Sequence, residues 1–348
     1  MQDCDLFVRV PFVVTPCSYL AGAFSPHTAG PVKDSYLRAL SEEMRQFKGE
    51  GLRVRSLYIG GGAATTLSVA QIDFLDERLR DAFGRLDCPI AITCDPGLLS
   101  SAALARWLSM GASRLVFRYF SSDPVECEQL GMTCSSADMR NTHRVLECAA
   151  NRVIDMQVLV GLAGQTAETL IGTLEDSSHE RAMHYEFLPY DSVIPDADAL
   201  RREAELFAVA SEWMEEHGFR RYAAACFAKD GAERPDEVHR YRGACQLGIG
   251  AGCASALGDM AWVNTANVDA YILGAGDPSA IVAGATELDS ASCDLRASFD
   301  ALYHLGEIPY RDAHAELVAA GFLRREGDAV ALSNAGAMHF DSVFARMA

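Results

Sequence analysis

The sequence predicts an α/β fold, a partial (β/α)6 TIM-like barrel followed by a small C-terminal helical module. Short β-rich runs alternate with amphipathic runs as far as Tyr190, and the pattern then changes. Strands that alternate with helices imply a parallel sheet with right-handed crossovers, and six such units suit an open barrel better than a closed one of eight. The expected strands are Leu6–Phe12, Val54–Ile59, Ile90–Cys94, Arg114–Phe120, Val153–Gly161 and His184–Tyr190.

Two helices can be placed between the first three strands. The first is expected to turn one apolar face toward the sheet, formed by Tyr36, Leu37, Leu40, Met44 and Phe47. The second begins with Ser68 and Gln71, which have the spacing of a capping box. Its inward-facing residues are Ile72, Leu75, Leu79 and Phe83.

The chain is expected to divide into three parts. Residues 1–190 form the barrel, residues 191–284 a mixed α/β extension, and residues 285–348 a winged-helix-like module with a tight β-turn at Glu326–Asp328. Ligands of parallel barrels bind where the strands end, so we look for a site at the carboxyl ends of the strands.

Composition narrows the classes of function. The 348 residues are 49% hydrophobic, yet no apolar run approaches the roughly 18 residues of a membrane span, and no basic region precedes an apolar start. We therefore expect a cytoplasmic protein without a membrane span. The formal net charge of -18 argues against nucleic acid as a partner of the terminal module. The 11 cysteines include no CxxC pair, so we expect reduced thiols, mostly small core residues.

Several motifs follow one another in the order of a known family. The first strand ends in Pro11-Phe12 before Cys17 and Tyr19. The later motifs are Gly60-Gly61-Gly62, Asp95-Pro-Gly97, Gly111-Ala-Ser-Arg-Leu115, Leu130-Gly131, Gly161-Leu-Ala-Gly-Gln-Thr166 and Leu247-Gly-Ile-Gly-Ala-Gly252. Together they resemble the radical S-adenosylmethionine (SAM) superfamily, in particular oxygen-independent coproporphyrinogen III oxidase and the heme chaperone HemW. The resemblance covers nearly the whole chain and implies the radical SAM type of barrel.

The resemblance also implies that the cofactor site has degenerated. The family's CxxxCxxC motif holds a [4Fe-4S] cluster, and its first and third positions here are Val13 and Leu20. Only Cys17 remains, as a vestigial metal ligand. Because valine and leucine have no lone pair to offer iron, we expect neither a cluster nor bound SAM.

The SAM contacts of the family are changed as well. Its glutamate on the third strand, glutamine on the fourth and aspartate on the fifth correspond to Thr93, Phe120 and Gln157. The vestigial SAM site would consist of Tyr19, Gly60, Gly61, Gly62, Thr93 and Gln157. The three glycines have two open interpretations, an anion site made of backbone amides or a sharp turn needed for folding.

A second set of family positions has become small and apolar. Where the family carries glutamate, serine and asparagine, this chain has Ala223, Ala225 and Cys226. Such replacements are expected in a site that has lost its ligand, because an unsatisfied buried polar group is costly. Heme stays a candidate ligand, with His239, expected at the surface, and Cys88 before Pro89 as weak candidates for axial ligation.

The sequence thus predicts a non-catalytic pseudoenzyme related to HemW that binds a tetrapyrrole such as heme, or a protein partner. One alternative is a radical SAM enzyme of porphyrin metabolism with atypical cluster ligation. The other is a structural subunit that pairs with an intact paralogue.

Overall fold

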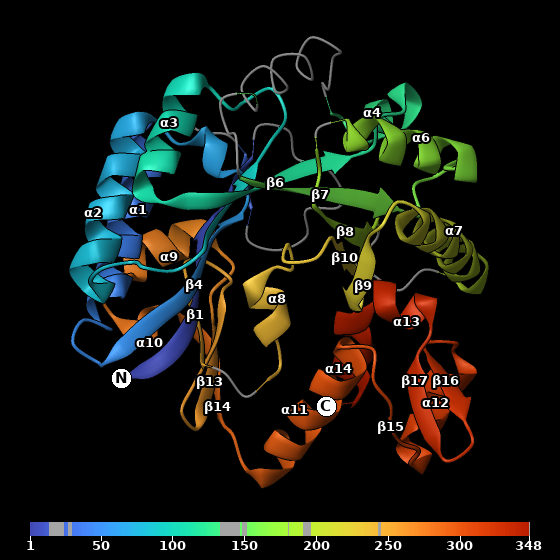
Figure 1. The fold of residues 1–348 in the computed structure, drawn as a ribbon. Helices are drawn as coiled ribbons and strands as arrows, with labels where there is room; N and C mark the ends of the chain where they lie inside the picture. Colours follow the sequence, from blue (N-terminus) through green and yellow to red (C-terminus); the bar gives the residue numbers. More distant parts are fainter. Residues whose placement is uncertain are drawn as a thin grey trace. The chain divides into compact units, whose positions relative to one another are not determined.

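The computed structural model describes residues 1–13, 24–26, 30–132, 147, 152–179, 181–190, 196–242 and 245–347. The chain forms two compact units, each assembled from separate segments. Unit 1 comprises Met1–Phe117, Cys134–Arg152 and Ala244–Asp289, and unit 2 comprises Arg118–Thr133, Val153–Gly243 and Ser290–Ala348. Figure 1 shows the chain coloured along its sequence.

Unit 1 is built on a sheet whose central strands are parallel. Its strands lie in the order β14-β13-β12-β11-β1-β4-β5-β6, and β6 belongs to unit 1 as far as Phe117. The parallel strands are β1 (Gln2–Val10), β4 (Leu52–Gly61), β5 (Ile90–Cys94), β6 (Ala112–Phe120) and β11 (Cys245–Ile249). The antiparallel strands are β12 (Ala254–Leu257), β13 (Met260–Asn264) and β14 (Val282–Glu287). A short parallel pair, β2 (Phe12–Val13) and β3 (Ser25–Pro26), follows β1.

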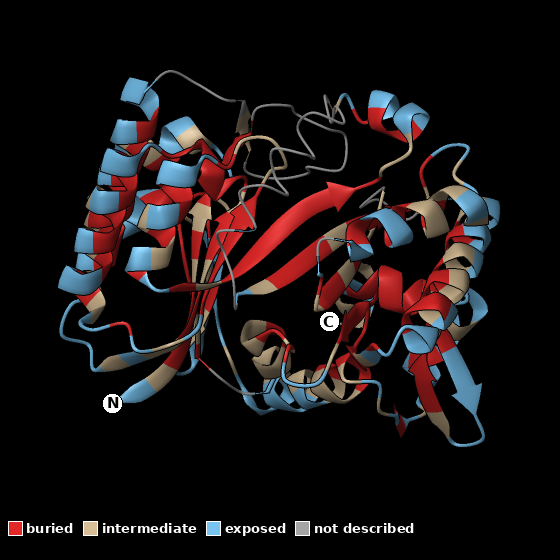
Figure 2. Ribbon diagram, turned by 45° about the horizontal axis from the view of Figure 1, so that its top comes forward, coloured by how far each residue is buried: buried red, intermediate tan, exposed pale blue. Residues whose placement is uncertain are grey.

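Helices cover the sheet of unit 1. These are α1 (Gly30–Arg45), η1 (Ala64–Thr66), α2 (Val69–Phe83), α3 (Ser101–Met110), α9 (Val268–Gly274) and α10 (Pro278–Ile281). Helices α1, α2 and α3 pack side by side (Figure 1), each with one buried and one exposed side (Figure 2). The predicted inner face of α1 is confirmed for Tyr36, Leu37, Leu40 and Met44, which are at most 2% exposed. It is wrong for Phe47, which lies beyond the end of α1 and is partly exposed. The predicted capping box of α2 is confirmed too: Ser68 Oγ accepts from Gln71 N, and Gln71 Oε1 accepts from Ser68 N.

The main strands of unit 2 lie in the order β7-β8-β10-β9. Strands β7 (Val153–Val160) and β8 (His184–Pro189) are parallel, whereas β10 (Cys226–Ala228) and β9 (Arg220–Ala223) form an antiparallel extension. The accompanying helices are α4 (Pro124–Gln129), α6 (Ala167–Ser178), α7 (Ala197–Glu216) and α8 (Pro235–His239).

The C-terminal segment of unit 2 has the expected helical module with a hairpin. Its helices are α11 (Ser290–Tyr303), η2 (Asp312–His314), α12 (Ala315–Ala319), α13 (Asn334–Met338) and α14 (Phe340–Met347). Strands β15 (Ile308–Pro309), β17 (Ala329–Leu332) and β16 (Leu323–Glu326) form a three-stranded sheet. Gly327, with φ 66°, makes the predicted turn between β16 and β17. Within unit 2, His339 Nε2 lies 2.6 Å from Glu203 Oε2 of α7, and both side chains are buried.

All six strands predicted from the sequence are present, with ends that differ by a few residues. Six of the described cysteines are buried, as expected of small core residues: Cys4, Cys94, Cys127, Cys226, Cys245 and Cys253. Within the described ranges no helix is both long enough and apolar enough to cross a bilayer. The division into parts at residues 190 and 284 stays a prediction.

Candidate functional site

The glycine turn at the carboxyl end of β4 is held by the chain itself. Gly62 N donates to Val10 O at 2.8 Å, and Ala63 N donates to Phe12 O at 2.9 Å. A Cβ atom on Gly62 would lie 2.6 Å from Phe12 O, so only glycine allows this close approach. At Gly62 the geometry therefore favours the turn interpretation over anion binding by the amide.

The position of the first cluster ligand does not fit a [4Fe-4S] cluster. Val13 on β2, predicted to stand at this position, is 1% exposed, and its side chain has no atom that can bind iron. Cys17, Tyr19 and Leu20 lie outside the described residues. Within the described ranges no group of three or more His, Cys, Asp or Glu side chains could hold a metal ion.

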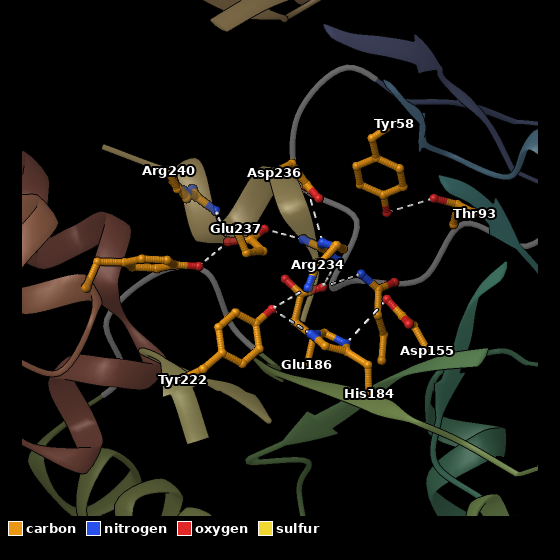
Figure 3. A network of polar contacts seen from close by, with 12 residues as sticks. Tyr58, Thr93, Asp155, His184, Glu186, Tyr222, Arg234, Asp236, Glu237 and Arg240 are labelled. Carbon is orange, nitrogen blue, oxygen red and sulfur yellow. Dashed lines mark hydrogen bonds and ion pairs between the residues drawn. The ribbon is translucent and has the colours of Figure 1, made fainter. Parts of the chain in front are cut away.

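Two polar residues of the expected SAM site are already hydrogen-bonded within their own unit. In unit 1 the Thr93 hydroxyl lies 2.9 Å from that of Tyr58. In unit 2 Gln157 Nε2 donates to Glu186 Oε2 at 2.9 Å. Figure 3 shows Thr93 turned toward Tyr58. Phe120, at the end of β6, is 3% exposed. These contacts give each polar side chain a partner without a ligand.

Unit 2 contains a buried carboxylate, imidazole and phenol in a row. Asp155 on β7 and His184 on β8 are 1% and 0% exposed. His184 Nδ1 lies 3.3 Å from Asp155 Oδ2, and its Nε2 lies 2.8 Å from the Tyr222 hydroxyl (Figure 3). Because both ring nitrogens face protein partners and the ring is buried, His184 cannot serve as an axial ligand of heme.

A second group surrounds Arg234, whose side chain is 3% exposed. We call it the Arg234 cluster, and its members are Arg234, Glu186, Asp236, Glu237 and Tyr303. Arg234 forms ion pairs with Glu186 at 2.9 Å, with Asp236 at 3.2 Å and with Glu237 (Figure 3). The Tyr303 hydroxyl of α11 donates to Glu237, which links the C-terminal module to α8 inside unit 2.

The pKa values of the neighbouring carboxyl groups Asp236 and Glu237 shift in opposite directions. Burial raises the pKa of Asp236 above its ordinary range, although Arg234 opposes the shift. Burial would also raise the pKa of Glu237, but the guanidiniums of Arg234 and Arg240 outweigh it, so this pKa lies below its ordinary value. Glu237 is therefore ionised in the native state. The cluster is an internally compensated ionic network with its cation saturated by carboxylates.

Sequence reasoning missed most of this network. It placed Glu237 beside a surface histidine, whereas the Glu237 side chain is 5% exposed. A signal was present in the alternation of polar residues: Asp155 and Gln157 share one face of β7, and His184 and Glu186 share one face of β8.

The small residues that replace polar family residues are buried where they were expected to be. Ala223 is 0%, Ala225 9% and Cys226 2% exposed. Burial raises the pKa of the Cys226 thiol well above its ordinary value, so the thiol is neutral at neutral pH.

Comparisons with known proteins can now be set beside this geometry. No family model matches the chain. A heme chaperone HemW of Bacillus subtilis is 25% identical over 288 residues, which cover 76% of this chain and 74% of that protein. HemW of Escherichia coli is 22% identical over 268 residues, with 72% and 70% covered. HemW of Mycobacterium tuberculosis (strain H37Rv) is 22% identical over 379 residues, with 98% and 94% covered.

Among solved structures, coproporphyrinogen III oxidase (HemN) from Escherichia coli, a radical SAM enzyme, superimposes with a TM-score of 0.81 at 18% identity. The match covers 99% of this chain and 90% of that one. The fold thus defines the class, an α/β barrel of the radical SAM type with its C-terminal module, as the sequence predicted. More particularly, the chain is similar in sequence to the HemW heme chaperones and in fold to HemN. The assignment of Val13 and Leu20 to two of the three positions of the CxxxCxxC motif stays a prediction.

Proposed function

We propose that this chain is a non-catalytic relative of the HemW heme chaperones, which acts in the cytoplasm and binds a tetrapyrrole without cleaving SAM. The observation that carries the proposal is Val13. A buried valine stands at the position of the first cluster ligand, on a strand whose backbone the glycine turn holds in place. Without three thiolates the cluster has no site at which SAM could be reduced.

Ligand binding itself is supported by the relatives, since HemW proteins of Bacillus subtilis and Escherichia coli are heme chaperones by name. The residues of the expected SAM site support the second half of the proposal, that this chain does not bind SAM. Thr93 and Gln157 carry no negative charge and already have hydrogen-bond partners, so a SAM ammonium held by these two residues would be buried without an ion pair to either of them. That costs several kcal/mol, and each 1.4 kcal/mol weakens affinity about tenfold.

Axial ligation by a thiolate receives little support. Burial raises the pKa of Cys88 to about 11, so very little thiolate is present at neutral pH. Cys88 also precedes β5, at the amino end of a strand, whereas ligands of such barrels bind at the carboxyl ends. Its role is therefore to end a loop before a strand.

Anaerobic reconstitution with iron and sulfide tests the catalytic half of the proposal. The expected result is no stoichiometric cluster, and the same low iron content in the wild type and in Cys17→Ala. About four irons per chain that depend on Cys17 would overturn it and favour a radical SAM enzyme with atypical ligation.

Hemin titration followed by absorption spectroscopy tests the binding half. A saturable shift of the heme spectrum with one hemin per chain supports the proposal. No shift, together with co-purification of an intact paralogue, would favour the structural subunit instead.

A further inference from the structure

Arg9 lies between two glycine-rich segments of unit 1, Gly60–Gly62 and Leu247–Gly252. On β1 the buried residues Leu6, Val8 and Val10 alternate with Phe7 and Arg9, which are partly exposed on the other face. Arg9 pairs in register with Gly60 of β4, at the carboxyl end of both strands.

The flanking glycines make room for this side chain. A Cβ atom on Gly61 would lie 3.0 Å from Arg9 Cγ, and one on Gly250 would lie 3.0 Å from Arg9 Cβ. Both glycines have positive φ, 87° and 119°, so the backbone also requires glycine there. The two motifs therefore enclose the stem of an arginine at the end of the barrel strands where ligands bind.

Arg9 lacks a counter-charge among the residues that the structure describes. No carboxylate there forms an ion pair with it, and its Nε is buried without a hydrogen-bond partner in that part of the chain. The nearby carboxylate of Glu43 accepts hydrogen bonds from Gly250 N at 2.8 Å, from Asn264 Nδ2 at 2.7 Å and from Tyr271.

The remaining neighbour supplies no negative charge either. Burial raises the pKa of Cys253 to about 12 although Arg9 lowers it, so this thiol is neutral at neutral pH. Within the described part of a chain whose net charge is -18, Arg9 has no carboxylate partner, whereas Arg234 has three. A partly buried guanidinium without an anion among the described residues is costly, and an anionic ligand would compensate its charge.

Aromatic rings lie beside the guanidinium. The Cζ atom of Arg9 is 5.5 Å from the ring centroid of Phe7 and 5.9 Å from that of Phe24. The rings of Phe7 and Tyr58 are 5.5 Å apart. All three rings are partly exposed, so they offer apolar surface next to a positive charge. Phe7, Arg9, Phe24 and Tyr58 together are called the Arg9 ledge.

We propose that the Arg9 ledge binds a planar tetrapyrrole, with the Arg9 guanidinium pairing with a propionate carboxylate and the aromatic rings contacting the macrocycle. This assignment rests on the proposed function and names the contact that recognises the ligand. A guanidinium forms two parallel hydrogen bonds with a carboxylate, and rings beside it contact a flat apolar ligand. The methionine carboxylate of SAM offers the same charge, and the experiment separates the two sources.

The test compares hemin with its dimethyl ester, which lacks the carboxylate charges, by titration of the wild type, Arg9→Met and Arg9→Lys. Arg38→Met is the matched control, since Arg38 is an exposed arginine of α1 in the same unit. Arg9→Met should weaken hemin binding about ten- to a hundredfold, the range of a lost hydrogen bond to a charged group. Arg9→Lys should recover much of the loss, and Arg38→Met should bind as the wild type does.

The ester should bind the wild type as weakly as hemin binds Arg9→Met, and the affinity of the ester should not change in that variant. This comparison of two ligands on the wild type needs no variant, so misfolding of Arg9→Met would not remove the test. Tight hemin binding that neither the ester nor Arg9→Met weakens would overturn the Arg9 assignment and leave the proposed function standing. No hemin binding by the wild type would overturn both. Micromolar SAM binding that is lost in Arg9→Met would assign Arg9 to the methionine carboxylate instead and refute the ledge as a tetrapyrrole site.

Discussion

Arg234→Met tests whether the Arg234 cluster is an internally compensated network that the fold depends on. The change keeps an unbranched side chain of similar reach but removes the guanidinium. It leaves the carboxylates of Glu186, Asp236 and Glu237 at 15%, 24% and 5% exposure without their shared cation. Removing one partner of a buried ion pair typically costs about 3–5 kcal/mol, and we expect a loss in that range. Urea unfolding followed by circular dichroism measures it.

Arg220→Met is the matched control, because it makes the same chemical change at an exposed ion pair of the same unit. Arg220 lies 2.6 Å from Glu233, with side-chain exposures of 62% and 23%. Exposed pairs contribute about 0–1 kcal/mol, so this variant should unfold close to the wild type. Adding Glu237→Gln to Arg234→Met should recover part of the lost stability, since it removes one stranded charge.

The loss caused by Arg234→Met should also depend on pH. The pKa of Glu237 is lowered in the native state, so its contribution to stability is present above its unfolded pKa of about 4.3 and is lost as the pH falls toward the lowered value. Arg234 supplies much of that lowering. The difference between wild type and Arg234→Met should therefore narrow as the pH falls below about 4.3. Two results would refute the reasoning. One is an equal loss of unfolding free energy in Arg234→Met and Arg220→Met. The other is a difference between wild type and Arg234→Met that does not change with pH.

Three further outcomes are expected. Burial raises the pKa of Glu43. The free energy of unfolding of the wild type, relative to that of Glu43→Gln, should therefore fall as the pH rises from about 4.3 through the raised pKa. A difference between the two unfolding curves that stays constant with pH would contradict this. Gly250→Ala should cost more than about 1 kcal/mol because its φ is 119°, whereas Gly172→Ala, in helix α6 with open space around it, should leave thermal stability unchanged or higher. The double change Val13→Cys with Leu20→Cys restores the CxxxCxxC spacing and should allow iron uptake without SAM cleavage. A folded variant that takes up no iron in a reconstitution assay would show either that the loop has been rebuilt or that Val13 and Leu20 do not occupy the ligand positions.

Local patterns in the sequence were sufficient for the secondary structure and for the family. The alternation of β-rich and amphipathic runs located all six strands, and the Ser68 and Gln71 spacing located the start of α2. Both signals work because hydrogen bonding within a strand or a helix end involves residues that are close in sequence. The predicted loss of cluster ligation at Val13 also comes from the sequence, since it depends on residue type and not on packing.

Contacts between distant segments were decided only by the tertiary structure. Glu186, Arg234 and Tyr303 come from a strand, a loop and a helix that are tens of residues apart, and no periodicity relates them. Arg9 reads in the sequence as one polar residue of an alternating strand. Its contact with two glycine turns, at Gly61 and Gly250, exists because β1 pairs with both β4 and β11 in the folded sheet. The sequence by itself thus determined which strands form, and it carries the prediction that a cofactor ligand is lost. Which charges are compensated depends on the three-dimensional neighbours that only strand pairing and packing bring together, and so does the anion site that we propose at Arg9.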